Sequence, residues 1–189
     1  MNAVVAEDFR LTAYLRLMAA SRRQGFAEHA LASMLASHLC GAGSMPVLLG
    51  LDAEIFARML DLHFPSFEWP SGLSAPAWDM ADMPEYAELK ALFDDYRIAP
   101  NDEQPWWTTL LIAGCTGRNH LWEDLGLFER TDLTELIRVN YPELAARNSR
   151  DMKWKKFLYK QLCEREGIVA CPAPTCDACA QFSECFSPE

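Results

Sequence analysis

The sequence has few basic residues for its length. Its 189 residues include 17 Lys and Arg against 27 Asp and Glu, which gives a formal net charge of −10 at pH 7. Proteins that bind nucleic acids usually neutralise phosphates with clustered Lys and Arg. The acidic balance therefore argues against a nucleic-acid-binding protein.

Long uncharged apolar runs are also missing. No stretch approaches the roughly 20 residues that a helix needs to span a bilayer. The first residues, Met1 to Val5, are not a basic region followed by a long apolar run. We therefore expect no membrane partner and a cytoplasmic location, where thiols stay reduced.

The composition is not that of a disordered chain, which would combine low hydrophobicity with high charge. Half of the residues are hydrophobic and 11% are aromatic. That content is enough for a core that does not depend on bound metal for all of its stability. The length fits one domain, or one domain with a tail.

Convincing alternating strands are absent, and helical periodicity dominates. Helices are predicted at about 9–18, 27–39, 52–64, 85–96, 106–115, 120–127, 132–141 and 151–166, with a short turn starting at Pro142. Asp52 and Asp132 are the expected N-caps, Asp132 as part of a D-x-x-E capping pair. Gly126 and Gly167 are the expected C-terminal stops. The prediction is an all-α protein with a compact multi-helix domain.

Two segments interrupt the helical pattern. Residues 65–84 are rich in proline and contain Trp69 and Trp78, which predicts a long connector whose aromatic side chains pack back onto the domain. Residues 167–189 hold most of the cysteines and predict an irregular C-terminal cysteine-rich metal-binding tail. The expected division is a helical domain over 1–166 and a cluster-binding tail over 167–189.

The tail contains four of the seven cysteines, Cys171, Cys176, Cys179 and Cys185, with the spacing C-x4-C-x2-C-x5-C. In a reducing compartment, such clustering indicates metal ligation rather than a disulfide framework. Thiolates are the soft ligands that iron–sulfur chemistry requires. Zinc modules usually place two cysteine pairs a dozen or more residues apart. The compact run favours a polynuclear metal–sulfur cluster and leaves a structural zinc site as the alternative.

Charge is distributed unevenly along the chain. Residues 52–103 carry a net charge of −9, whereas residues 150–165, directly before the cysteines, carry +4. Basic side chains in this second stretch are candidates to offset a negatively charged cluster or to receive an anion such as molybdate. They are Lys153, Lys155, Lys156, Lys160 and Arg165. A solvated helix face is the alternative interpretation.

Other potential ligands have weaker support. Cys163 lies near the end of the last predicted helix, and His120 lies beside Leu121 and Trp122. A helical cysteine is more often a small buried side chain, and a lone histidine is more often structural. Cys40 and Cys115 are expected in the core, and whether Cys163 or His120 contributes a ligand stays open.

These residues resemble the NifQ family. The resemblance is carried by the run Met152-Lys-Trp-Lys-Lys-Phe-Leu-Tyr-Lys-Gln-Leu-Cys163 followed by the four-cysteine tail, and by the segments 120–127 and 141–148. It is best over 119–189, and the remaining part of the chain resembles the family mainly in length and helical character.

The resemblance implies a carrier rather than an enzyme. It implies a molybdenum–iron–sulfur cluster on Cys171, Cys176, Cys179 and Cys185, and supply of molybdenum for the iron–molybdenum cofactor of nitrogenase. The implied partners are the cofactor assembly scaffold, its iron-protein reductase, and molybdate or another molybdenum source.

Three other functions remain as alternatives. A four-iron electron carrier and a structural zinc-binding domain would both use the same four thiolates. A helical iron–sulfur DNA glycosylase also ends in a similar cysteine loop, but it needs a basic DNA-binding face that this acidic sequence does not provide.

Overall fold

The structure is a computed structural model that describes residues 3–70, 80, 83, 85–98, 106–167 and 182–186. Within these ranges the protein is entirely helical, and they contain no β-strand. The elements are α1 (Ala3–Ala20), α2 (Phe26–Leu39), the 3-10 turn η1 (Val47–Gly50), α3 (Ala53–His63), α4 (Tyr86–Asp95), α5 (Trp106–Cys115), α6 (Leu121–Leu125), α7 (Arg130–Asn140), α8 (Pro142–Arg147), α9 (Trp154–Arg165) and α10 (Phe182–Phe186).

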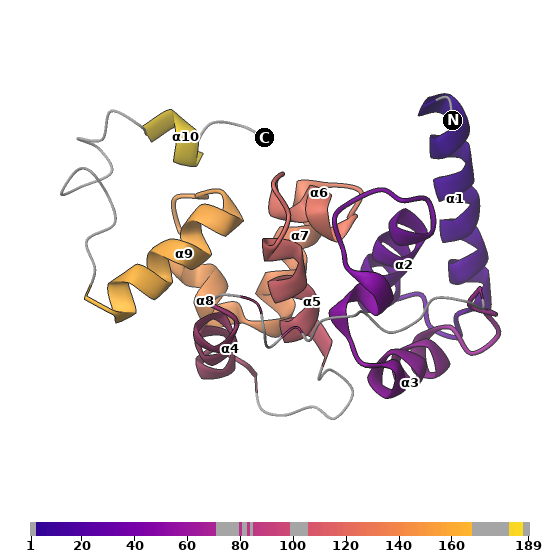
Figure 1. Ribbon diagram of the computed structural model, residues 1–189, viewed down its shortest axis with the longest axis horizontal. Coiled ribbons are helices and arrows are strands. Elements are labelled where there is room, and N and C mark those ends of the chain that lie inside the picture. Colours follow the sequence, from indigo (N-terminus) through magenta and orange to yellow (C-terminus); the bar gives the residue numbers. More distant parts are fainter. Residues whose placement is uncertain are drawn as a thin grey trace.

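The helices form three neighbouring groups (Figure 1). Helices α1, α2 and α3 lie at one end of the molecule, and α4, α8 and α9 lie at the other, with α5, α6 and α7 between them. Neighbours in space include α1 with α2, α2 with α7, α4 with α5, and α4 with α9. The end that holds α9 also holds the short helix α10.

Helix α5 forms the centre of the core because it is apolar on every side. All of its residues except Thr109 are buried, including the tryptophans Trp106 and Trp107. A helix that is hydrophobic all round must be surrounded by other elements. The middle position of α5, between the two end groups, follows from that composition.

A buried hydrogen bond between His63 and Glu28 joins α3 to α2. His63 Nδ1 of α3 lies 2.8 Å from Glu28 Oε1 of α2, and both side chains are almost fully buried. The other carboxylate oxygen accepts a hydrogen bond from the Gly25 N–H at 3.1 Å. Burial opposes ionisation of Glu28, but the hydrogen bond from His63 and the backbone bonds outweigh it, so the pKa of Glu28 is lowered.

Gly126 joins α6 to the first two helices. Its φ of 77° is in the left-handed region, and an added Cβ would lie 2.5 Å from Ser37 Cβ. The Gly126 carbonyl accepts hydrogen bonds from Ser37 Oγ at 2.6 Å and from Arg10 Nη2 at 3.1 Å. Only glycine combines this backbone conformation with such close approach, and the predicted stop at Gly126 is confirmed.

Most predicted helices are confirmed within a few residues. Asp52 is the N-cap of α3 and accepts a hydrogen bond from the Ile55 N–H at 2.8 Å. The predicted N-cap at Asp132 is wrong, because α7 begins at Arg130 and Asp132 instead accepts a hydrogen bond from the Glu129 N–H at 3.2 Å. A carboxylate one turn into the helix satisfies the same exposed N–H groups.

Trp69 of the proline-rich connector packs back onto the domain as predicted. Its ring lies edge-on to Phe56 at 5.2 Å and stacks near His38 at 6.4 Å. Trp78 lies outside the described residues. Among the described helices, no segment has the length and apolarity required to cross a membrane.

Candidate metal centre

Of the four predicted ligands, the structure describes Cys185. This residue lies in α10, where it is partly buried. Cys171, Cys176 and Cys179 lie outside the described residues. Within the part of the chain that is described, no three His, Cys, Asp or Glu side chains gather as a metal site would require. The local surroundings of Cys185 therefore carry the structural information about the predicted centre.

Helix α10 is attached to the beginning of α9. The Lys153 N–H donates a hydrogen bond to the Cys185 carbonyl at 2.9 Å. Phe182 and Phe186, one helical turn apart, stack on each other with ring centroids 4.4 Å apart. The tail was expected to be irregular, and over residues 182–186 that expectation is wrong, because the stacked rings and the backbone contact support a short helix.

Arg150 packs against this aromatic pair. Its guanidinium lies 5.5 Å from the Phe182 ring centroid and 5.3 Å from that of Phe186. Arginine over aromatic rings contributes a cation–π attraction that holds the two segments together. Sequence reasoning did not single out Arg150, although the i, i+4 spacing of the two phenylalanines beside a cysteine was a usable signal for an aromatic contact.

The loop between α8 and α9 has a well-defined conformation. Asn148 Nδ2 donates to the Met152 carbonyl and Asn148 Oδ1 accepts from the Met152 N–H, both at 2.9 Å. Asp151 adopts a left-handed φ of 55° and accepts two hydrogen bonds from Arg130, at 2.7 and 2.8 Å. These contacts fix the loop that presents Arg150 to α10.

Two of the basic side chains that were candidates to offset the cluster are used within the helical domain instead. Lys155 forms an ion pair with the fully buried carboxylate of Asp124 and donates to the Gly117 carbonyl at 2.9 Å. Arg165 forms an ion pair with Asp95 of α4, with Nη1 2.9 Å from Oδ2. The first contact attaches α9 to the α5–α6 region, and the second attaches it to α4.

Asp124 has an unusual environment for a carboxylate. Burial disfavours its ionised form, but Lys155, Ser44 and Asn119 donate hydrogen bonds to it, so the net effect is a lowered pKa. The Asn119 N–H lies 3.0 Å from Asp124 Oδ2. Two acidic residues, Glu123 and Asp124, lie between Trp122 and Leu125, and nothing in the sequence indicates which of them is buried.

The remaining lysines of α9 face outward to different degrees. Lys156 is exposed, while Lys153 and Lys160 are partly buried. Lys160 Nζ lies 3.5 Å from Glu164 Oε1 on the same helix. Near α10, the described positive charges are those of Arg150, which contacts its aromatic rings, and Lys160, which lines the same cavity as Phe186.

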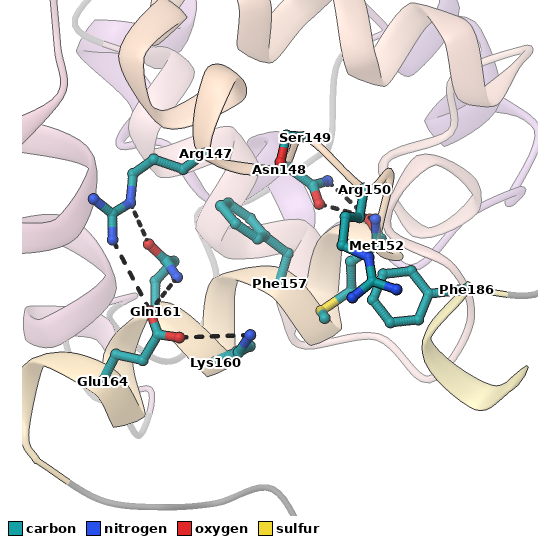
Figure 2. A pocket seen from close by; sticks show the side chains of 10 residues that line it. All are labelled: Arg147, Asn148, Ser149, Arg150, Met152, Phe157, Lys160, Gln161, Glu164 and Phe186. Carbon is teal, nitrogen blue, oxygen red and sulfur yellow. Dashed lines mark hydrogen bonds and ion pairs between the residues drawn. The ribbon is translucent and has the colours of Figure 1, made fainter. Parts of the chain in front are cut away.

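A cavity of about 260 Å³ lies between the α8–α9 loop, α9 and α10 (Figure 2). Phe157 projects into it from α9, and Phe186 of α10 lies at one side next to Arg150. Arg147 and Lys160 line the cavity together with Glu164 and Gln161. Phe186, which lines the cavity, follows Cys185 in α10, but the Cys185 side chain is not among the groups that line it.

The other cysteines have different environments. Cys115 is buried, and burial raises the pKa of its thiol to about 12, so it is a core residue as predicted. Cys40 is only partly buried at the C-terminal end of α2, although burial still raises its pKa. Cys163 is partly buried in α9, and whether it contributes a ligand stays open.

His120 precedes the first residue of α6. Its backbone N–H donates to Glu123 Oε2 at 3.0 Å, so its main chain forms part of the helix start. The residues described around it do not include a group of three potential metal ligands. Whether His120 contributes to a metal site likewise stays open.

Comparison with known proteins points to one family. The family model described as NifQ matches residues 30–187, a range that contains all four tail cysteines. Protein NifQ of Azotobacter vinelandii is 37% identical over 160 residues, which cover 79% of this chain and 82% of that protein. Protein NifQ of Rhodobacter capsulatus is 34% identical over 159 residues, covering 84% of this chain and 87% of that protein.

A third relative, Protein NifQ of Klebsiella pneumoniae, is 46% identical over 69 residues, which cover 36% of this chain and 41% of that protein. No solved structure matches the chain. The resemblance seen in the sequence is therefore confirmed at the level of the family.

Proposed function

Because the chain belongs to the NifQ family, we propose that it is a metal–sulfur cluster carrier that supplies molybdenum for biosynthesis of the nitrogenase iron–molybdenum cofactor. The observation that carries the proposal is the C-x4-C-x2-C-x5-C run, which lies inside the range matched to the family. In this proposal the protein acts in the cytoplasm, in nitrogen fixation, and is a carrier rather than an enzyme.

The proposed ligands are the thiolates of Cys171, Cys176, Cys179 and Cys185. Four thiolates are a suitable donor set for a molybdenum–iron–sulfur cluster because soft sulfur ligands prefer such metals over hard cations. The position of Cys185 supports this assignment. It lies on a helix that the Lys153 main chain and the Arg150 guanidinium both contact, so the positive charge of Arg150 lies beside the helix that carries this thiolate.

The cluster is the cargo of the proposed reaction. The helical domain, residues 1–166, provides a stable body, and residues 167–189 provide the thiolates. Transfer requires that the receiving protein replace these thiolates with its own ligands. The proposed partners are the cofactor assembly scaffold and its iron-protein reductase, and the proposed source is molybdate or another form of molybdenum.

Metal analysis of protein purified without oxygen tests the proposal. We expect iron, acid-labile sulfide and molybdenum in the wild-type protein. Cys→Ser substitution at position 171, 176, 179 or 185 should remove most of the molybdenum, because a serine oxygen is a harder ligand than a thiolate. Cys40→Ser is the matched control, since Cys40 is the C-cap of α2, at the end of the molecule opposite α10 (Figure 1), and it should leave the metal content unchanged.

The alternatives give different results in the same analysis. Zinc without sulfide would identify a structural zinc domain, and iron with sulfide but no molybdenum would identify a four-iron electron carrier. Salt-dependent DNA binding would identify a glycosylase-like protein. Full molybdenum content in two or more of the four tail variants would rule out the proposed ligand set.

A further inference from the structure

The cavity beside α10 has a composition that suits a small anion. Of the ten residues that line it, Arg147, Arg150 and Lys160 are basic and Glu164 is acidic, a formal excess of two positive charges. The whole chain, by contrast, carries −10. A concave site with an excess of one sign of charge concentrates ions of the opposite sign.

The acidic group in this cavity is only loosely paired with the basic ones. Glu164 Oε2 lies 4.0 Å from Arg147 Nη2, and Glu164 Oε1 lies 3.5 Å from Lys160 Nζ. Both distances exceed the roughly 2.7–2.9 Å of a strong charge-assisted hydrogen bond. An incoming anion with closer contacts would therefore compete successfully with Glu164 for these two cations.

The walls of the cavity are set before any ligand arrives. Arg147 Nε donates to Gln161 Oε1 at 2.6 Å, which fixes the guanidinium at one side of the cavity (Figure 2), where it also lies 5.8 Å from the Tyr96 ring centroid. The Asn148 contacts with Met152 fix the loop on the other side. A preformed cationic site loses little conformational entropy on binding.

Size and lining restrict the ligand further. A volume of about 260 Å³ is below the roughly 300–1,000 Å³ typical of sites for drug-sized organic molecules. The buried side chains of Met152 and Phe157 line the cavity beside the buried amide of Gln161, so its lining is both apolar and polar. This combination fits a compact anion that keeps some of its water.

We propose that the cavity formed by Arg147, Arg150 and Lys160 binds a tetrahedral oxyanion, with molybdate as the physiological ligand. Naming molybdate rests on the proposed function, whereas oxyanion binding rests on the cavity alone. Phe186 forms part of the wall, and Cys185 precedes it in the same helix. Oxyanion bound here is therefore held against the helix that carries Cys185, which suits an entry site for the metal.

The test measures binding without the cluster. Equilibrium dialysis with sodium molybdate, followed by metal analysis, is carried out on the full chain with Cys→Ser at positions 171, 176, 179 and 185. Saturable binding at low ionic strength, weakened by added salt, is expected. The double variant Arg147→Gln/Lys160→Gln should raise the dissociation constant at least fivefold. Lys156→Gln, which removes an exposed lysine of the same helix outside the cavity, is the matched control and should leave it unchanged.

A variant of Glu164 distinguishes an effect on anion binding from an effect on the local fold. Glu164→Gln keeps an oxygen that can accept the 2.7 Å hydrogen bond from Gln161 Nε2 but removes the competing negative charge. It should tighten molybdate binding severalfold, a gain that loss of local structure would not produce. Circular dichroism of each variant verifies the fold.

Repeating the dialysis with sodium sulfate in place of sodium molybdate tests whether the site is selective for molybdate. Tighter binding of molybdate than of sulfate supports the full proposal. Equal binding overturns molybdate as the particular ligand and supports a general oxyanion site. Absence of saturable binding, or equal losses in Lys156→Gln and in the double variant, overturns the site. None of these outcomes depends on the tail thiolates, so failure here leaves the cluster-carrier proposal to its own test.

Discussion

The two buried carboxylates, Glu28 and Asp124, are the residues that most clearly connect local chemistry with stability. Each is almost or entirely inaccessible to solvent, and each is ionised because specific donors surround it. A buried charge that loses its hydrogen-bond or charge partners destabilises the fold, whereas a buried charge with all of its partners is tolerated. Removing a donor, or protonating the carboxylate, should therefore destabilise the fold.

Acid should destabilise the protein through these two groups. Their folded-state pKa values lie below the ordinary values of 4.5 for Glu28 and 3.8 for Asp124. Their stabilising contribution is therefore complete above the ordinary values and is lost as pH falls through the lowered ones. The free energy of unfolding, measured in urea at a series of pH values, should decrease steadily below about pH 4.5.

Glu28→Gln measures how much of the loss of stability in acid comes from Glu28. A glutamine at position 28 does not titrate, so the decrease in stability below pH 4.5 should be shallower than in the wild-type protein. Glu88→Gln changes an exposed residue of α4 and serves as the control. Identical pH profiles for the wild-type protein and Glu28→Gln would contradict the prediction.

At the scale of elements, α9 shows what periodicity predicts well. The residues predicted to share one face, Trp154, Phe157, Leu158, Gln161 and Leu162, are all buried. This pattern is local, because side chains three and four residues apart lie on the same side of a helix. Gly167, with a φ of 68°, likewise follows the end of the helix as predicted.

The contacts that α9 makes at either end could not be predicted in the same way. Lys155 meets Asp124, 31 residues away, and the Lys153 N–H meets Cys185, 32 residues away. Nothing in a helical period distinguishes Lys155 from its exposed neighbour Lys156. The part of the candidate site that depends on such long-range contacts, including Arg150 and the cavity, required the structure.

Lys155 should be the lysine of α9 on which stability depends most. Lys155→Met leaves the Asp124 carboxylate buried without its cation, which should lower the free energy of unfolding by about 3 kcal/mol. Lys156→Met, one position further on, should change it by less than about 0.5 kcal/mol. Urea denaturation of both variants measures the difference. Similar losses in the two variants would show that the ion pair with Asp124 contributes little.

At the scale of the whole molecule, the core and the candidate metal centre occupy different parts of the chain. The largest fully buried side chains, including Trp106, Trp107 and Tyr141, come from helices outside the cysteine tail. Composition indicated this division, because an apolar content of one half is sufficient for a core of helices. The association between α9 and α10 is the described contact through which the two parts meet.

Metal removal should therefore leave the helical domain folded. Its stability comes mainly from apolar burial around α5 and from buried contacts such as Glu28–His63; of the tail cysteines, the described Cys185 packs against this core but is only partly buried. Anaerobically purified protein should keep its far-ultraviolet circular dichroism after treatment with a chelator and reductant, while the visible absorption of the cluster disappears. The full chain with all four tail cysteines changed to serine should give the same helical signal. A small metal-dependent domain would instead unfold on chelation, because metal binding would provide its folding free energy. Global loss of helix in the chelated protein would show that the cluster and the helical core fold as one unit.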